Sequence, residues 1–172
     1  MNIKLIPIKE IEKEKFIKDL QSAFEIAVIK EYGKQDGEVI PRKDIENSIN
    51  AKGVETFNIS LNNEIVGGVA IAINENTMHN SLDLFFIKQT YQSKGIGLSV
   101  WKAIEEKYPN TKVWETVTPY FEKRNIHFYV NNCGFKIVEF FNPYHKDDNI
   151  NNMQENNTIG QDYFFRFEKE MK

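Results

Sequence analysis

The sequence predicts an α/β or α+β fold in which one mixed sheet is flanked by helices. Two observations support this prediction. Segments with strand and helix periodicity follow one another in the order β-α-α-β-β-β-α-β-α-β-β. The 172 residues, 41% of them hydrophobic, are enough to build a core. The sequence contains no internal repeat and no second-domain signal, so residues 1–172 are expected to form one domain.

The N-terminal third is expected to hold one strand and two helices. Residues 2–8 alternate in part and reach Pro7, as in a first strand. A helix is predicted next, because apolar residues recur at helical spacing: Ile11, Ile17, Leu20, Phe24 and Val28. It is expected to end near Gly33. A shorter helix is predicted over 42–51.

The middle of the chain is dominated by strands. Two of them, over 55–61 and 65–73, are joined by Asn62-Asn63-Glu64, which is a hairpin signal. Residues 82–87 are almost continuously apolar, as in a strand that is covered on both faces.

Helices and strands alternate again in the C-terminal half. The predicted segments are helices over about 95–108 and 121–133, and strands over 112–117, 135–141 and 162–169. The loop 142–161 between the last two strands is rich in Asn and Asp, and it is too polar to pack a core.

Composition excludes several classes of protein. The net charge is −3 and no basic stripe is present, which argues against nucleic-acid binding. No apolar run approaches the roughly 18 residues of a membrane span, and the N-terminus lacks the apolar stretch of a signal peptide. The single cysteine, Cys133, cannot form an internal disulfide, so a cytoplasmic protein is expected.

The segment most informative about chemistry is Gln92-Ser93-Lys94-Gly95-Ile96-Gly97, at a predicted strand-to-helix junction. A helix N-terminus leaves backbone N–H groups unpaired and carries a partial positive charge. Glycines let the backbone approach a ligand closely. The segment is therefore expected to cradle an anion such as a pyrophosphate, with a further donor from Gln92 and a charge from Lys94.

Two nucleotide-binding motifs fit this segment poorly. A Walker loop needs Lys-Ser or Lys-Thr after its glycines, and neither follows here. A dinucleotide fingerprint needs glycine or alanine three residues after Gly97, where Val100 stands. A nucleotide-binding domain is therefore the hypothesis that these residues favour least.

The same segment resembles the coenzyme A loop, Gln/Arg-x-x-Gly-x-Gly/Ala, of the GNAT superfamily of N-acetyltransferases. The chain resembles that family over nearly its whole length, including the helix that ends in Asn132-Cys133-Gly134-Phe135. The resemblance implies a mixed, mostly antiparallel sheet of seven strands with about four helices. It also implies an enzyme that moves an acetyl group from acetyl-CoA directly to a primary amine.

The resemblance further implies where the donor binds. In the family the pantetheine arm lies between the fourth and fifth strands and bonds to strand backbone like an added strand. Here the backbone partners would be Phe85 and Ile87. Asn125 is a further candidate contact, although the family's frequent asparagine aligns with Glu122. The pyrophosphate would bind the loop backbone of Gln92, Ser93, Lys94, Gly95, Ile96, Gly97 and Leu98.

Tyr129 resembles the tyrosine that many family members place beside the sulfur, where it would protonate the leaving thiol. The family usually has three residues between this tyrosine and the glycine of the Gly-Phe step, but here four separate Tyr129 from Gly134. One extra residue rotates a helical position by about 100°. The other interpretation of Tyr129 is a core aromatic residue with its hydroxyl at the surface.

A base is also needed, because an alkyl ammonium group with a pKa near ~10.4 must lose a proton before it attacks. Asp83 and Glu115 lie in apolar predicted strands, where burial would raise the pKa of each carboxyl. The alternative for each is a solvated or ion-paired carboxylate at a strand end. A base that acts through water is a third route.

The remaining features concern metal binding and the acceptor. His79, His127 and His145 show no metal-ligand spacing, and one cysteine cannot complete a zinc site, so no metal is expected. The loop 142–161 could belong to an acceptor site, to a homodimer contact or to a plain surface loop. A non-catalytic coenzyme A sensor or interaction module on the same fold stays the alternative to an enzyme.

Overall fold

In the computed structural model, seven strands form one sheet in the order β1-β2-β3-β4-β5-β7-β6. The structure describes residues 1–147 and 163–172. The strands are β1 (Ile3–Pro7), β2 (Val54–Leu61), β3 (Glu64–Ala72), β4 (His79–Ile87), β5 (Val113–Pro119), β6 (Lys136–Phe141) and β7 (Phe164–Glu170). Neighbouring strands are antiparallel except for the parallel pair β4 and β5, so the predicted mixed, mostly antiparallel sheet is confirmed.

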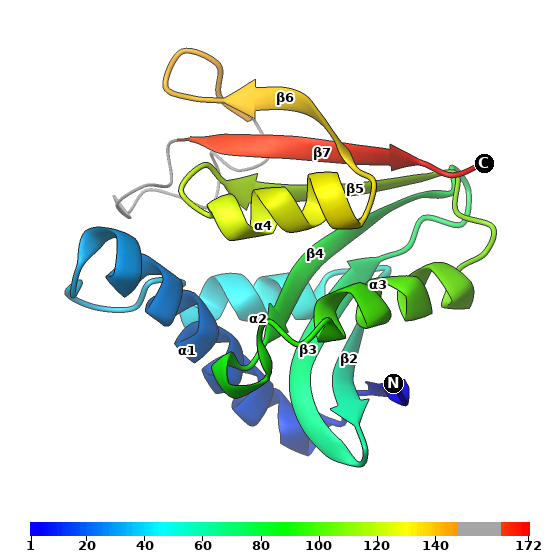
Figure 1. Cartoon of the computed structure of the whole chain (residues 1–172), viewed down its shortest axis with the longest axis horizontal. Coiled ribbons are helices and arrows are strands. Elements are labelled where there is room, and N and C mark those ends of the chain that lie inside the picture. Colours follow the sequence, from blue (N-terminus) through cyan, green and yellow to red (C-terminus); the bar gives the residue numbers. More distant parts are fainter. Residues whose placement is uncertain (148–162) are drawn as a thin grey trace.

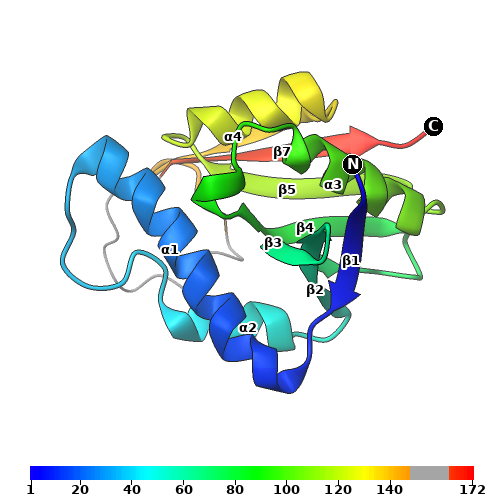
Figure 2. The same cartoon turned by 60° about the horizontal axis from the view of Figure 1, so that its bottom comes forward.

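Helices cover both faces of the sheet. On one face lie α1 (Lys13–Tyr32) and α2 (Arg42–Asn50), and on the opposite face lie α3 (Ile96–Lys107) and α4 (Lys123–His127), as Figures 1 and 2 show. This arrangement is a helix–sheet–helix sandwich with one apolar layer on each side of the strands. None of the helices in the described part of the chain is long and apolar enough to cross a membrane.

The larger apolar layer lies under α3. Its fully buried aromatic side chains come from α3, β5 and β7 and from the residue before β6: Trp101, Trp114, Phe167 and Phe135. The rings of Trp101 and Trp114 meet edge to face, with centroids 5.4 Å apart. These contacts hold the start of β5 firmly beneath α3.

The second apolar layer lies under α1 and α2. Phe16 and Leu20 of α1 are buried against Phe86 of β4, and the rings of Phe16 and Phe86 have centroids 5.4 Å apart. The prediction that Ile11 belongs to this apolar stripe is wrong, because its side chain is 87% exposed. Ile11 lies in a 3₁₀ turn, Glu10–Glu12, that precedes α1 and has a different periodicity.

The predicted fourth helix, 121–133, is shorter and partly irregular. After α4 the chain forms a π-helical turn over Phe128–Asn132, in which the Cys133 N–H donates to the Phe128 carbonyl at 3.0 Å. A π turn holds one residue more than an α turn. The π turn therefore accommodates the extra residue between Tyr129 and Gly134, and the helical segment ends with it at Asn132.

The strands β4 and β5 pair over only part of their length. Residues 79–82 of β4 pair with residues 113–116 of β5, and the register ends at Leu82 and Thr116. Asp83 follows directly as the extra residue of a β-bulge, since Leu82 pairs with Ile71 and Leu84 with Ala70 on β3. Beyond the bulge β4 turns away from β5, which leaves a gap between the two strands (Figure 1).

Candidate active site

The edge of β4 that faces the gap carries backbone groups without a strand partner. The Lys88 N–H donates to the Val66 carbonyl of β3 at 2.8 Å. Because alternate residues of a strand point their backbone groups to the same side, Phe86 also faces β3, whereas Phe85 and Ile87 face the gap. In the described part of the chain no strand pairs with this edge. Such an edge can accept an extended ligand as an added strand.

The loop after β4 leads into α3 through an unusual backbone path. Ser93 and Gly95 both have positive φ angles, of 63° and 76°. Gly95 occupies the N-cap of α3, and no side chain caps the helix. The first intrahelical bond runs from the Ser99 N–H to the Gly95 carbonyl, so the N–H groups of Ile96, Gly97 and Leu98 have no acceptor within the helix. These donors converge with the positive end of the helix dipole.

Gly97 also contributes to packing, because it lies close to an aromatic ring. A Cβ atom at this position would lie 3.2 Å from the Phe128 ring of the π turn. The Phe128 ring in turn lies 6.0 Å from the Phe85 ring of β4, measured between centroids. Gly97 thus lets α3 approach the π turn closely, and that contact brings the loop beside the gap.

The point at which β4 and β5 stop pairing, at Leu82 and Thr116, is the apex of the gap. Tyr129 lies beside this apex, on the α4 side of the sheet. Its side chain is only 6% exposed and packs against Phe135 and Phe167, each with ring centroids 5.6 Å away. Its hydroxyl bonds to Thr116. The Thr116 hydroxyl itself donates to the Leu82 carbonyl at 2.9 Å, across the last paired residues of β4 and β5. Burial raises the pKa of Tyr129, and the bond with Thr116 only partly opposes this rise, so the phenol is protonated at neutral pH.

Asp83 and Glu115 lie on the opposite side of the same apex. Glu115 alternates with the buried Trp114 and Thr116 and therefore faces the side of α1 and α2. Its registered neighbour on β4 is Ser81, whose hydroxyl donates to Asp83 at 2.5 Å.

Both carboxyls are perturbed by their surroundings. Burial raises the pKa of Asp83, although the side chain reaches solvent, and the Ser81 hydrogen bond partly opposes the rise. Burial also raises the pKa of Glu115, against the opposing charge of Arg166. Each carboxyl therefore holds its proton to a higher pH than an exposed one does.

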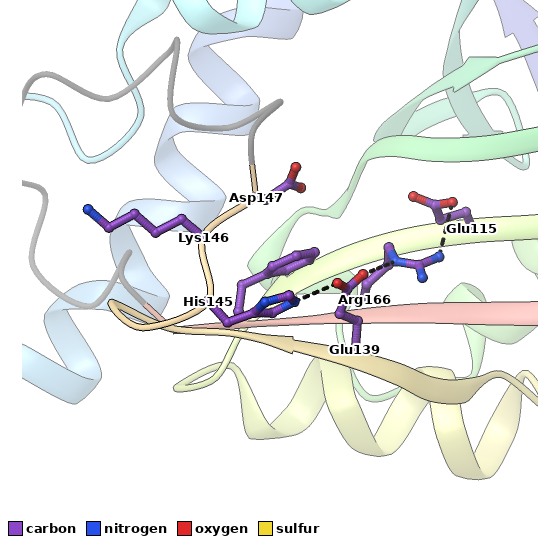
Figure 3. Close-up of a pocket in the computed structure, with 7 residues that line it drawn as sticks. Glu115, Glu139, His145, Lys146, Asp147 and Arg166 are labelled. Carbon is purple, nitrogen blue, oxygen red and sulfur yellow. Dashed lines mark hydrogen bonds and ion pairs between the residues drawn. The ribbon is translucent and has the colours of Figure 1, made fainter.

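A hollow of about 330 Å³ opens beside Glu115 (Figure 3). It is lined by Glu115, Glu139, Phe141, His145, Lys146, Asp147 and Arg166. Arg166 of β7 organises the wall, because it donates to Glu139 at 2.9 Å and to Glu168 at 2.5 Å and lies 3.5 Å from Glu115. His145 adds a 2.6 Å bond to Glu139. The hydrogen bonds from His145 and Arg166 lower the pKa of the Glu139 carboxyl. Lys146 extends away from this row of side chains.

Sequence reasoning named Glu115 as a candidate base and the loop 142–161, which holds His145, Lys146 and Asp147, as a possible acceptor site, but it did not connect them with Glu139, Phe141 and Arg166. The residues of the hollow come from β5, β6, β7 and the turn after β6, and only the strand register brings them together: Glu115 lies opposite Glu168, and Glu139 lies opposite Arg166. No local motif signals such pairing. Of the predicted loop 142–161, residues 148–161 lie outside the described part of the chain.

The remaining predicted contacts lie around the gap. Asn125 points its amide toward the Thr118 hydroxyl of β5 at 3.5 Å, a weak contact on the gap side of α4. Lys94 lies over the Tyr91 ring, 5.8 Å from its centroid. Glu122 forms the N-cap of α4, and burial raises the pKa of its carboxyl. Among the described residues no group of three or more His, Cys, Asp or Glu side chains is placed to hold a metal ion.

Comparison with known proteins links this geometry to one family. A model of the acetyltransferase (GNAT) family matches residues 14–135 of the chain. YrkN, an uncharacterized protein of Bacillus subtilis (strain 168), is 51% identical over 168 residues, which cover 95% of this chain and 91% of YrkN.

Solved structures share the fold at much lower sequence identity. A Bacillus subtilis acetyltransferase in complex with CoA is 17% identical, with a TM-score of 0.68 over 99% of this chain and 98% of that one. A GNAT family acetyltransferase from Elizabethkingia anophelis with acetyl-CoA bound is 16% identical, with a TM-score of 0.68 over 99% of both chains. The ribosomal-protein-S18-alanine N-acetyltransferase from Escherichia coli is 9% identical, with a TM-score of 0.70 over 99% of this chain and 94% of that one.

Proposed function

The chain belongs to the GNAT family of acetyltransferases, and from this premise we propose that it transfers an acetyl group from acetyl-CoA directly to a primary amine. One observation carries the proposal: β4 and β5 separate at Leu82 and Thr116, and a phenol and a carboxyl lie beside that point on opposite faces of the sheet. Tyr129 approaches it from the α4 side, and Asp83 approaches it from the side of α1 and α2.

The donor would bind along the gap. The backbone groups of Phe85 and Ile87 that face the gap would pair with the amides of the pantetheine arm, as strand groups pair in a sheet, and the arm would replace the Gln92 side chain at the Ile87 carbonyl. The diphosphate would bind the loop from Gln92 to Leu98, where the N–H groups of Ile96, Gly97 and Leu98 have no acceptor within α3. This arrangement would direct the thioester toward Thr116, and Asn125 on α4 would contact the same arm.

The proton transfers would divide between the two faces. The Asp83 carboxylate would take a proton from the ammonium group of the acceptor, and the freed nitrogen lone pair would attack the thioester carbonyl carbon. When the tetrahedral intermediate collapses, the C–S bond breaks and the Tyr129 hydroxyl would give its proton to the departing sulfur. The second proton that the attacking nitrogen must lose to become an amide would restore the Tyr129 phenol. Asp83 is favoured over Glu115 because none of the ion pairs among the described residues includes Asp83, whereas Arg166 already compensates Glu115.

The acceptor would approach through the hollow beside Glu115. Three carboxylates line it, those of Glu115, Glu139 and Asp147. Of its two basic side chains, Arg166 is already bonded to carboxylates and Lys146 extends away from the row (Figure 3). A cationic amine would therefore gain more from this surface than an anionic acceptor would. We propose that the acceptor carries a primary ammonium group, and that Glu115 helps to hold it.

Two further proposals concern the molecule as a whole. Residues 1–172 would act as one domain, because the loop, the apex and both carboxyls sit on a single sheet. The single cysteine, which is unpaired, is consistent with a cytoplasmic, reducing environment.

Calorimetric titration with acetyl-CoA tests the proposal, with ATP and NAD as controls, followed by an assay of thiol release with a panel of primary amines. We expect micromolar binding of acetyl-CoA alone and thiol release that depends on the amine. Binding without thiol release for any amine would favour the non-catalytic coenzyme A sensor. Absence of acetyl-CoA binding would refute both functions.

A further inference from the structure

Arg124 reaches from α4 across the mouth of the gap to the loop after β4. Its Nη1 donates to the Gln92 side-chain oxygen at 2.5 Å, and its Nη2 donates to the Ser93 hydroxyl at 3.2 Å. The Gln92 amide nitrogen in turn donates to the Ile87 carbonyl at the end of β4, at 2.9 Å. One guanidinium group therefore connects the helix of Tyr129 with the loop and with the open strand edge.

The partners of Arg124 are neutral, which distinguishes it from the other two arginines of the chain. Arg42 pairs with two glutamates and Arg166 with three. In the described part of the chain no carboxylate forms an ion pair with Arg124, although Glu122 lies within its electrostatic reach. An amide oxygen and a hydroxyl are weaker partners for a guanidinium than an anion is. The positive charge thus remains available at the loop surface.

The guanidinium group of Arg124 lies beside the loop that would hold an anionic ligand. Ser93, which Arg124 contacts, has a positive φ and stands two residues before the N-cap of α3. The unpaired N–H groups of the first turn of α3 follow directly. A diphosphate on these N–H groups would meet the guanidinium from the opposite side, where Arg can donate two parallel hydrogen bonds.

We propose that Arg124 is a cofactor-binding residue whose guanidinium group binds the diphosphate of coenzyme A from the α4 side of the gap. This inference rests on the proposed function, and it adds a side chain to a site otherwise built from backbone groups.

The test compares Arg124→Gln and Arg124→Lys with the wild-type protein and with Lys123→Gln as the matched control. Lys123 is the neighbouring exposed cation on α4, so its replacement removes the same charge away from the loop. Calorimetry gives the Kd for acetyl-CoA and for its dephospho form, which keeps the diphosphate but lacks the 3′-phosphate. Thiol release at high concentration gives kcat/KM for acetyl-pantetheine, which lacks the diphosphate.

We expect Arg124→Gln to weaken both acetyl-CoA and the dephospho form by about tenfold or more, and Arg124→Lys to weaken them less. The kcat/KM for acetyl-pantetheine should stay unchanged, as should every value for Lys123→Gln. Equal losses for acetyl-pantetheine, a loss confined to acetyl-CoA, or no loss beyond that of Lys123→Gln would each refute the role of Arg124. If the wild-type protein binds no acetyl-CoA, the proposed function itself fails.

Discussion

Tyr129 joins two environments, because its ring is part of the apolar layer and its hydroxyl meets the polar apex of the gap. The ring contacts Phe135 and Phe167, which hold it in place. The hydroxyl bonds to Thr116, and burial keeps its pKa above the ordinary value. A phenol held in this way is protonated and oriented, as a general acid must be.

Replacement of Tyr129 by Phe tests this acid role. The ring contacts remain, so we expect the fold and the affinity for acetyl-CoA to persist while kcat falls by about 10²-fold. Steady-state kinetics and calorimetry measure the two quantities. Tyr108→Phe is the matched control, because its hydroxyl bonds to Glu55 away from the gap and its loss should leave kcat unchanged. An unchanged kcat in Tyr129→Phe would return Tyr129 to a purely structural role.

Ionised Asp83 is expected to lower the stability of the folded protein, although the proposed reaction needs this form as the base. Because burial raises the pKa of Asp83, the folded state binds its proton more tightly than the unfolded state does. Ionised Asp83 therefore lowers the free energy of unfolding above that raised pKa, and this penalty disappears below the ordinary carboxyl pKa of ~3.9. Asp83→Asn should unfold at a higher temperature than the wild type at pH 7, with the difference vanishing near pH 3.

The same substitution should reduce thiol release by about 10²-fold if Asp83 is the base. Thermal unfolding at several pH values and amine-dependent thiol release measure the two effects. Asp36→Asn, in the exposed loop after α1, should change neither quantity. A full rate in Asp83→Asn together with a large loss in Glu115→Gln would transfer the role of base to Glu115.

At the scale of the element, the π turn is the feature that adapts this chain to its fold. The family's usual spacing has three residues between the tyrosine and the glycine, and this chain has four between Tyr129 and Gly134. The bond between the Cys133 N–H and the Phe128 carbonyl encloses the additional residue. The side chains on both sides of the turn keep their contacts, since Tyr129 and Phe135 are both buried.

Deletion of Asn131 should convert the π turn into an α turn. Asn131 is exposed, and its described side-chain contact is a bond to His127 one turn earlier. We expect the variant to fold cooperatively and to retain acetyl-CoA binding, as measured by circular dichroism, thermal unfolding and calorimetry. Deletion of the equally exposed Lys102 is the contrast, because it rotates the rest of α3 by about 100° and removes Ile104 from the core. Similar damage from both deletions would contradict this explanation of the π turn.

At the scale of the whole molecule, each face of the sheet gives its own route to the apex of the gap. The loop, α3 and the π turn stand on one face, and Asp83, Glu115 and the hollow stand on the other. On the proposed function, both substrates would be bound at once and transfer would need no acyl-enzyme. Cys133 is a poor nucleophile for such an intermediate, because it is buried and burial raises the pKa of its thiol to about 12.

Initial-rate kinetics should therefore show a sequential mechanism. Double-reciprocal plots against acetyl-CoA at several amine concentrations should intersect, because both substrates must be present before the C–S bond breaks. Cys133→Ala should preserve this pattern and should keep kcat within a few-fold of the wild type. Parallel lines, or release of thiol in a burst without amine, would instead indicate a covalent intermediate.

Sequence alone determined the order of the elements, the mixed sheet, the loop from Gln92 to Leu98 and the candidate residues Tyr129, Asp83 and Glu115. The elements and the loop are local features, which periodicity, turn chemistry and one strand-to-helix junction suffice to predict. Tyr129 became a candidate only through the resemblance to the GNAT family. The sequence alone could not predict that a π turn accommodates the extra residue, because that turn depends on packing against both α3 and the sheet.

Only the tertiary structure decided which residues meet. Arg124 and Gln92 lie 32 positions apart in the chain, and Arg166 and Glu115 lie 51 apart. The bulge at Asp83, the end of the β4–β5 register and the β5–β7–β6 pairing bring such residues together. Register and helix packing are properties of the assembled sheet, so contacts of this kind have no signature in any single stretch of sequence.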